Sequence, residues 1–160
     1  MNLNILLDCI GVAGFIMSTV SWIYTYMVNR KILTITVHEC RHSGVGYNFY
    51  LSIDNKSQLS IAVTNIELVT ESGAYAVHAV PEIARHRWTR VGNEYTHDFS
   101  WENIAMPINI PSLGSTGGYL LFQDCRDALT TDATEVTFRV YTNRGRPNEL
   151  LSRIPHHTIQ

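Results

Sequence analysis

One uncharged apolar segment near the N-terminus constrains this chain more than any other feature. Residues 9–27 contain no Asp, Glu, Lys or Arg, and a helix of this length spans roughly the 30 Å hydrocarbon core of a bilayer. A buried helix of a soluble protein would have a polar stripe rich in Lys and Glu. A secretory signal would have Lys or Arg before its apolar run and a small-residue cleavage site after it. Neither pattern is present, so we expect a single transmembrane helix within residues 1–30.

Small and hydroxylated residues recur along this helix at alternating spacings of three and four. They are Gly11, Gly14, Ser18, Ser21 and Thr25. In lipid, such residues let two helix backbones approach closely, and hydroxyls can form hydrogen bonds between helices. The spacing therefore predicts a helix-packing face and a homo-oligomer. Because hydroxyls tolerate water, Ser18, Ser21 and Thr25 would line a pore if the helices enclosed one.

Asp8 is the only Asp, Glu, Lys or Arg before Arg30, and it lies at the N-terminal end of this packing face. Two interpretations remain open. An ionisable group at membrane depth is by default a functional hypothesis, here within a ring of symmetry-related copies. Alternatively, Asp8 caps the helix at the membrane interface and favours the positive N-terminal end of its dipole.

The residues that flank the helix predict its orientation. Trp22, Tyr24 and Tyr26 form an interfacial aromatic belt near the C-terminal end, and Arg30 and Lys31 follow directly. Positively charged flanks stay on the cytoplasmic side of the membrane. We therefore expect an inner-membrane protein with its N-terminus outside and its C-terminal domain in the cytoplasm.

After the helix, hydrophobic residues change from a helical period to strict alternation. Leu33, Ile35 and Val37 alternate with polar residues, which is typical of a half-buried strand. Further strands are expected at 45–53, 59–69, 74–80, 87–91, 95–99, 104–110, 118–123 and 135–142. In 59–69 the apolar parity switches midway, which indicates a bulge or a crossing between sheets. This pattern predicts an antiparallel immunoglobulin-like β-sandwich over residues 31–145, with a small closed β-barrel as the alternative.

Residues 146–160 are expected to form a C-terminal tail, in which 148–154 make one or two helical turns. Of the three cysteines, Cys9 lies in the helix, and Cys40 and Cys125 lie in the soluble part. Two thiols are too few for a disulfide scaffold. Whether Cys40 and Cys125 pair is left open by the sequence.

The sequence contains no motif for catalysis. It has no phosphate-binding loop, zinc-type cysteine pair, nucleophile elbow or His-Glu-x-x-His helix. The best metal candidate is His38, Cys40 and His42, which would share one strand face. It lacks a fourth ligand, and its parity is opposite to that of the apolar residues, so we interpret it as the polar face of the strand. We expect no enzyme, no metal site and no cofactor.

The strongest candidate for ligand binding is a basic and aromatic segment at Arg85, Arg87, Trp88 and Arg90. Arginine binds phosphate oxygens through two parallel hydrogen bonds, and tryptophan can stack on a base. The segment thus predicts a site for an anionic ligand. The alternative is a solvated hairpin strand paired with the acidic segment downstream. A second basic group, Arg144, Arg146 and Arg153, has fewer charges than a usual polybasic lipid site.

Taken together, these features describe a self-associating membrane helix that carries a compact β-domain with no visible active site. This layout resembles the small membrane effectors of bacterial anti-phage defence systems, in which a membrane segment precedes a β-domain. The resemblance implies a nucleotide or oligonucleotide signal, or a partner protein, acting on the β-domain to permeabilise the membrane. The competing hypothesis is a membrane-tethered module that binds a protein partner and forms no pore.

Overall fold

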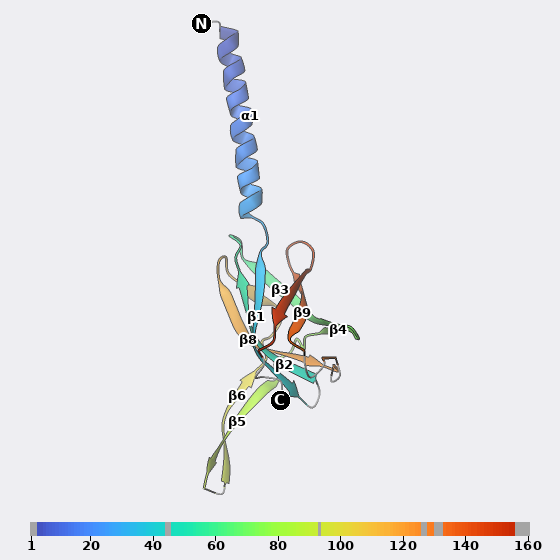
Figure 1. Ribbon diagram of the computed structural model, residues 1–160. Coiled ribbons are helices and arrows are strands. Elements are labelled where there is room, and N and C mark those ends of the chain that lie inside the picture. The colour runs from blue at the N-terminus through green and yellow to red at the C-terminus, as the bar shows by residue number, and fades with distance from the viewer. Residues whose placement is uncertain (1–2, 44–45, 93, 126–127, 130–132, 156–160) are drawn as a thin grey trace.

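A computed structural model places one long helix on a two-sheet β-domain (Figure 1). The structure describes residues 3–43, 46–92, 94–125, 128–129 and 133–155. Helix α1 (Leu3–Val28) extends away from the β-domain. Within it, Ile10–Val28 is long and apolar enough to cross a membrane, and this stretch is not buried by the rest of the chain.

The first sheet is antiparallel and has three strands in the order β1-β2-β8. These are β1 (Leu33–Ser43), β2 (Gly46–Asn55) and β8 (Ser115–Gln123). Alternate residues of a strand face opposite sides of the sheet. Phe49, Leu51 and Ile53 of β2 therefore face the core and are fully buried, whereas Tyr50 between them is exposed.

The second sheet runs β10-β9-β3-β4, and the short strand β7 also pairs with β3. Its strands are β3 (Ile61–Thr70), β4 (Gly73–Ala76), β7 (Ile108–Ile110), β9 (Glu135–Thr142) and β10 (Asn148–Arg153). The two sheets meet along the β1 and β10 edges, where the backbone N–H of Val37 donates to Ser152 Oγ at 3.1 Å.

Three phenylalanines form the centre of the core between the sheets. Phe49 of β2 and Phe122 of β8 come from the first sheet, and Phe138 of β9 comes from the second. All three are fully buried, and the ring of Phe49 meets those of Phe122 and Phe138 edge to face at 5.7 and 5.4 Å. Such aromatic contacts add to the burial of apolar area that holds the two sheets together.

A separate two-stranded hairpin projects from the sandwich. It consists of β5 (Ile83–Val91) and β6 (Glu94–Glu102). In Figure 1 the hairpin leaves the sandwich at the end opposite to α1. We call Ile83–Glu102 the distal hairpin.

The predicted fold class, a mainly β immunoglobulin-like sandwich after one apolar helix, is confirmed at the level of two facing antiparallel sheets. Across the described residues both sheets are open, so the alternative of a closed barrel does not apply. The parity switch predicted for 59–69 is also present, because the pairing of β3 with β9 shifts register between Val63 and Asn65.

The helical turns predicted for 148–154 are wrong. Asn148–Arg153 form β10 and pair antiparallel with β9, with Leu150 opposite Phe138. This part of the predicted C-terminal tail is therefore an edge strand of the second sheet. Helix propensity is a weak local preference, and here pairing with an existing strand outweighs it.

Cys40 does not lie on the polar face of its strand. The pairing of β1 with β2 shifts register between Val37 and Glu39, so the residues beyond this bulge change face. Cys40 is thereby fully buried, and His38 and His42 are exposed. Cys40 and Cys125 are both free and buried, and no disulfide joins them.

Candidate functional site

The residues of the predicted packing face all lie on α1 and all are exposed. They are Gly11, Gly14, Ser18, Ser21 and Thr25. A Cβ atom added at Gly11 or Gly14 would meet nothing within 4 Å. The β-domain therefore does not use this face, and another helix can approach it. Asp8 also lies in α1, but its side chain is outside the described part of the structure.

The hydroxyl groups on this face differ in their hydrogen bonding. Thr25 Oγ1 donates to the carbonyl oxygen of Ser21 at 2.9 Å, so its proton is already used within the helix. Among the described residues, the hydroxyls of Ser18 and Ser21 have no hydrogen-bond partner. Ser18 and Ser21 are thus the two hydroxyls best placed to bond to a neighbouring helix.

The base of the distal hairpin is fixed to the first sheet by Arg85. Its Nη1 donates to Tyr119 Oη at 3.0 Å and lies 3.4 Å from Glu39 Oε2. Its guanidinium also lies 5.2 Å from the centre of the Trp101 ring. The hydrogen bond to Tyr119, with the nearby charge of Glu39, raises the pKa of Arg85. Arg85 is therefore a positioning residue that joins β5 to β1 and β8.

Asn103 forms the second attachment of the hairpin base. It is buried, and its Nδ2 donates to the carbonyl oxygens of His78 and Val80 at 2.9 and 3.1 Å. Its Oδ1 accepts from the backbone N–H of Glu82. One amide side chain thus satisfies three backbone groups on the segment that enters β5. No local sequence pattern marks this role.

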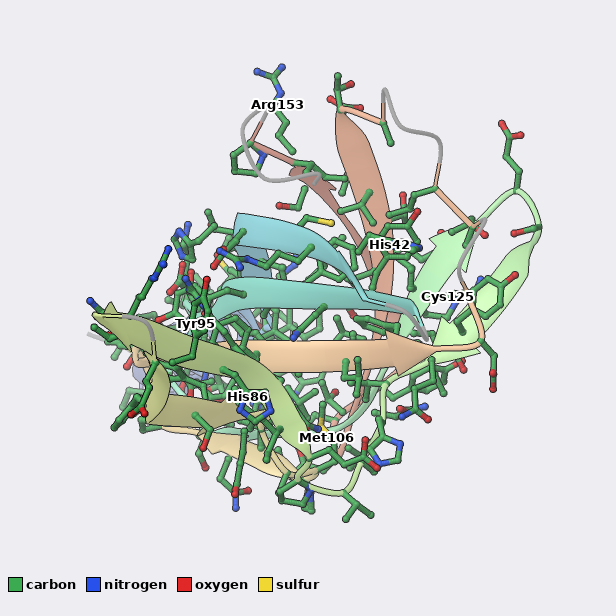
Figure 2. The ribbon with its side chains drawn as sticks, turned by 90° about the horizontal axis from the view of Figure 1, so that it is seen from below. His42, His86, Tyr95, Met106, Cys125 and Arg153 are labelled. Carbon is green, nitrogen blue, oxygen red and sulfur yellow. The ribbon has the colours of Figure 1, made fainter. Side chains whose placement is uncertain are left out.

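Beyond its base, the distal hairpin exposes aromatic and basic side chains. Tyr95 and Phe99 are 68% and 55% exposed, and Arg87 and Arg90 are exposed as well. The Phe99 ring meets Trp101 edge to face at 4.8 Å, and the Arg90 guanidinium lies 6.0 Å from the centre of the Tyr95 ring. Figure 2 looks onto the sandwich from the hairpin side, where Tyr95 and His86 lie well apart from Cys125.

The structure separates the residues predicted to bind an anionic ligand. Arg85 lies opposite Trp101, Arg87 opposite Phe99 and Arg90 opposite Tyr95. Because side chains alternate along a strand, Arg85 and Arg87 share one face of the hairpin and Arg90 lies on the other. Arg85 is also bound to Glu39. Trp88 lies in β5, and its side chain is outside the described residues.

His38, Cys40 and His42 do not form a metal site. His38 Nε2 is 3.0 Å from Ser52 Oγ, and Cys40 lies in the core. Burial and the neighbouring Cys125 raise the pKa of Cys40 to about 12, so it stays a neutral thiol. Among the described residues, no group of three or more His, Cys, Asp or Glu side chains is arranged to hold a metal ion.

No protein-family model matches the chain, and no curated protein matches it. The functional interpretation therefore depends on the exposed face of α1 and on the distal hairpin.

Proposed function

We propose that this protein is a single-pass membrane protein that displays the distal hairpin to a protein partner in the cytoplasm. The observation that carries the proposal is the arrangement in Figure 1, where α1 and the hairpin leave the sandwich at opposite ends. With α1 in the bilayer, the sandwich acts as a spacer that holds the hairpin away from the membrane surface. Arg30 and Lys31, directly after α1, support a cytoplasmic location of the sandwich.

The hairpin has the composition of a protein-binding surface. Interface residues with large contributions to affinity are enriched in Trp, Tyr and Arg, and the hairpin exposes Tyr95, Arg87 and Arg90. An isolated two-stranded hairpin is at best marginally stable in water. Arg85 and Asn103 stabilise its base, but its outer part extends from the sandwich without a covering layer (Figure 1). A partner that covers the exposed rings would supply that layer.

The charges of the hairpin favour a protein partner over a nucleic acid. Arg85, Arg87 and Arg90 are balanced along its sequence by Glu94, Asp98 and Glu102. Nucleic-acid affinity comes largely from neutralising phosphates with an excess of positive charge. A surface of mixed charge with exposed aromatic rings is better suited to a partner of mixed charge.

Site-specific photo-crosslinking in cells tests this proposal. A photoreactive amino acid at Phe99 should give one discrete adduct, and Arg87→Glu should weaken that adduct by placing a carboxylate on the same face. The control position is Leu151, which is apolar and 63% exposed but lies on β10. Adducts of equal yield at both positions, or none at Phe99, would remove the hairpin as the binding surface.

A second candidate function is a pore-forming effector, and one specific observation favours it. The packing face of α1 is unpartnered within the chain, and Ser18 and Ser21 have hydroxyls available there. In this function α1 helices assemble into a bundle, and ligand or partner binding on the sandwich controls whether the bundle conducts. The resemblance to anti-phage membrane effectors implies that opening would collapse the membrane potential.

A further inference from the structure

The junction between α1 and the sandwich brings together basic residues that are far apart in the sequence. Arg144, in the turn between β9 and β10, donates from Nη2 to the carbonyl oxygen of Asn29 at 3.1 Å. Lys31 donates from Nζ to the carbonyl oxygen of Arg146 at 2.5 Å and to Thr142 Oγ1 at 3.2 Å. The turn after β9 is thereby held against the end of the helix. We call Arg30, Lys31, Arg144 and Arg146 the junction cluster.

The positive charge of the junction cluster is uncompensated. Within the described part of the chain, none of its four cations lies within 4.0 Å of a carboxylate oxygen. Burial, and then the charge of Arg144, lowers the pKa of Lys31. Arg144 Nη1 is buried and has no hydrogen-bond partner. A buried donor without an acceptor is costly, and this one is shielded from solvent. An anion held by the exposed side chains of Arg30 and Arg146 would relieve the repulsion among the four cations.

The position of the junction cluster next to the aromatic residues of α1 defines its depth relative to the membrane surface. Tyr26 lies in the last turn of α1, and Arg30 is the second residue after the helix ends at Val28. Interfacial Trp and Tyr rings sit at the level of the lipid headgroups. A groove of about 460 Å³ runs along this end of α1 and is lined by Trp22, Thr25, Tyr26, Asn29, Arg30 and Lys31. The groove therefore joins an apolar aromatic wall to a basic rim.

We propose that the junction cluster binds the phosphate of an anionic phospholipid headgroup. The inference rests on the proposed function, because it requires that α1 lies in a bilayer. Arg30 and Arg146, which are exposed, would hold the phosphate together with Lys31, which lines the groove, and the aromatic wall would contact the glycerol and upper acyl chains. A lipid fits better than a free phosphate ion, since a free ion would make no use of Trp22 and Tyr26. Bound lipid would then fix the sandwich relative to the membrane surface.

The test compares lipid selectivity in two full-length variants of equal charge. Arg30→Gln with Arg146→Gln removes two exposed cations and keeps the hydrogen bonds made by Lys31 and Arg144. Arg87→Gln with Arg153→Gln removes two exposed arginines elsewhere. Each protein is purified in detergent and titrated with phosphatidylglycerol, phosphatidylcholine or inorganic phosphate, and bound molecules are counted by native mass spectrometry.

Wild-type protein and the Arg87/Arg153 variant should retain phosphatidylglycerol in preference to phosphatidylcholine. One basic residue near a membrane surface changes affinity for anionic lipid about fivefold, so the Arg30/Arg146 variant should lose on the order of 30-fold. The proposal would be overturned if wild-type protein retained both lipids equally, or if both variants lost phosphatidylglycerol equally. Binding of inorganic phosphate that lipid does not displace would also overturn it. Alkaline extraction of wild-type membranes tests the anchor separately, because release of the protein would refute the membrane location itself.

Discussion

Phe138→Ala is expected to destabilise the sandwich by about 3–5 kcal/mol, a large part of the stability of an ordinary domain. Phe138 is fully buried, and its ring in the second sheet meets both Phe49 and Phe122 of the first, at 5.4 and 5.9 Å. Its removal leaves a cavity between the sheets that the surrounding strands cannot fill. Urea titration of the full-length protein in detergent, followed by the β-sheet signal in circular dichroism, measures the loss.

The matched control is Phe99→Ala, which makes the same chemical change on the distal hairpin. Phe99 is 55% exposed and contacts Trp101, so its loss should cost less than about 1 kcal/mol. Similar losses for the two variants would mean that Phe138 does not lie at the centre of the core. The two sheets would then not pack around these three phenylalanines.

Gly14→Leu is expected to shift the full-length protein from oligomer to monomer without affecting its folding. A Cβ atom at position 14 would meet nothing within the chain, so any effect must come from a neighbouring copy. A leucine on a close-packed helix face separates the backbones and removes the contacts that drive association in lipid. A loss of about 1.4 kcal/mol corresponds to a tenfold weaker association constant, which analytical ultracentrifugation in detergent measures.

Ala13→Leu is the control for this prediction, because it also places leucine at a small exposed position but lies off the packing face. It should leave the oligomer intact. If both variants weakened the oligomer equally, or if neither did, the packing face would not be what joins the helices. The same pair addresses the second candidate function. A pore would require wild-type and Ala13→Leu proteins to depolarise cells in a membrane-potential dye assay and Gly14→Leu to leave the potential unchanged. A potential unchanged by wild-type protein would favour the non-conducting anchor.

Periodicity in the sequence predicts much of this fold. A strand or helix that is buried on one side repeats its apolar residues at the period of that secondary structure. The apolar run of α1, the alternation of Leu33, Ile35 and Val37, and the bulge in β3 are all of this kind. The sequence does not indicate β10, because it has no clear alternation and its strand conformation depends on pairing with β9. The sequence does not indicate the change of face at Cys40, because a bulge in the pairing of β1 with β2 leaves no mark in composition.

The candidate sites depend even more on contacts between distant residues. Composition alone indicates the segment containing Arg85, Arg87 and Arg90, but it does not reveal that Glu39 and Tyr119 bind Arg85. Asn103, which fixes the base of the hairpin, is one asparagine among several in the sequence. Similarly, Arg144 bonds to Asn29 and Lys31 bonds to Thr142 only because the end of β9 lies beside the end of the helix.

The central claim is that α1 anchors the sandwich in a membrane with the distal hairpin in the cytoplasm, and thiol labelling tests it most directly. Cys40 and Cys125 are buried free thiols. The variant Cys9→Ser with Glu94→Cys therefore has one reactive thiol, near the turn of the hairpin. We predict that alkaline extraction leaves this protein in the membrane fraction, and that a membrane-impermeant maleimide labels it only after the cells are permeabilised. Release by alkali would contradict the anchor, and labelling of intact cells would contradict the orientation.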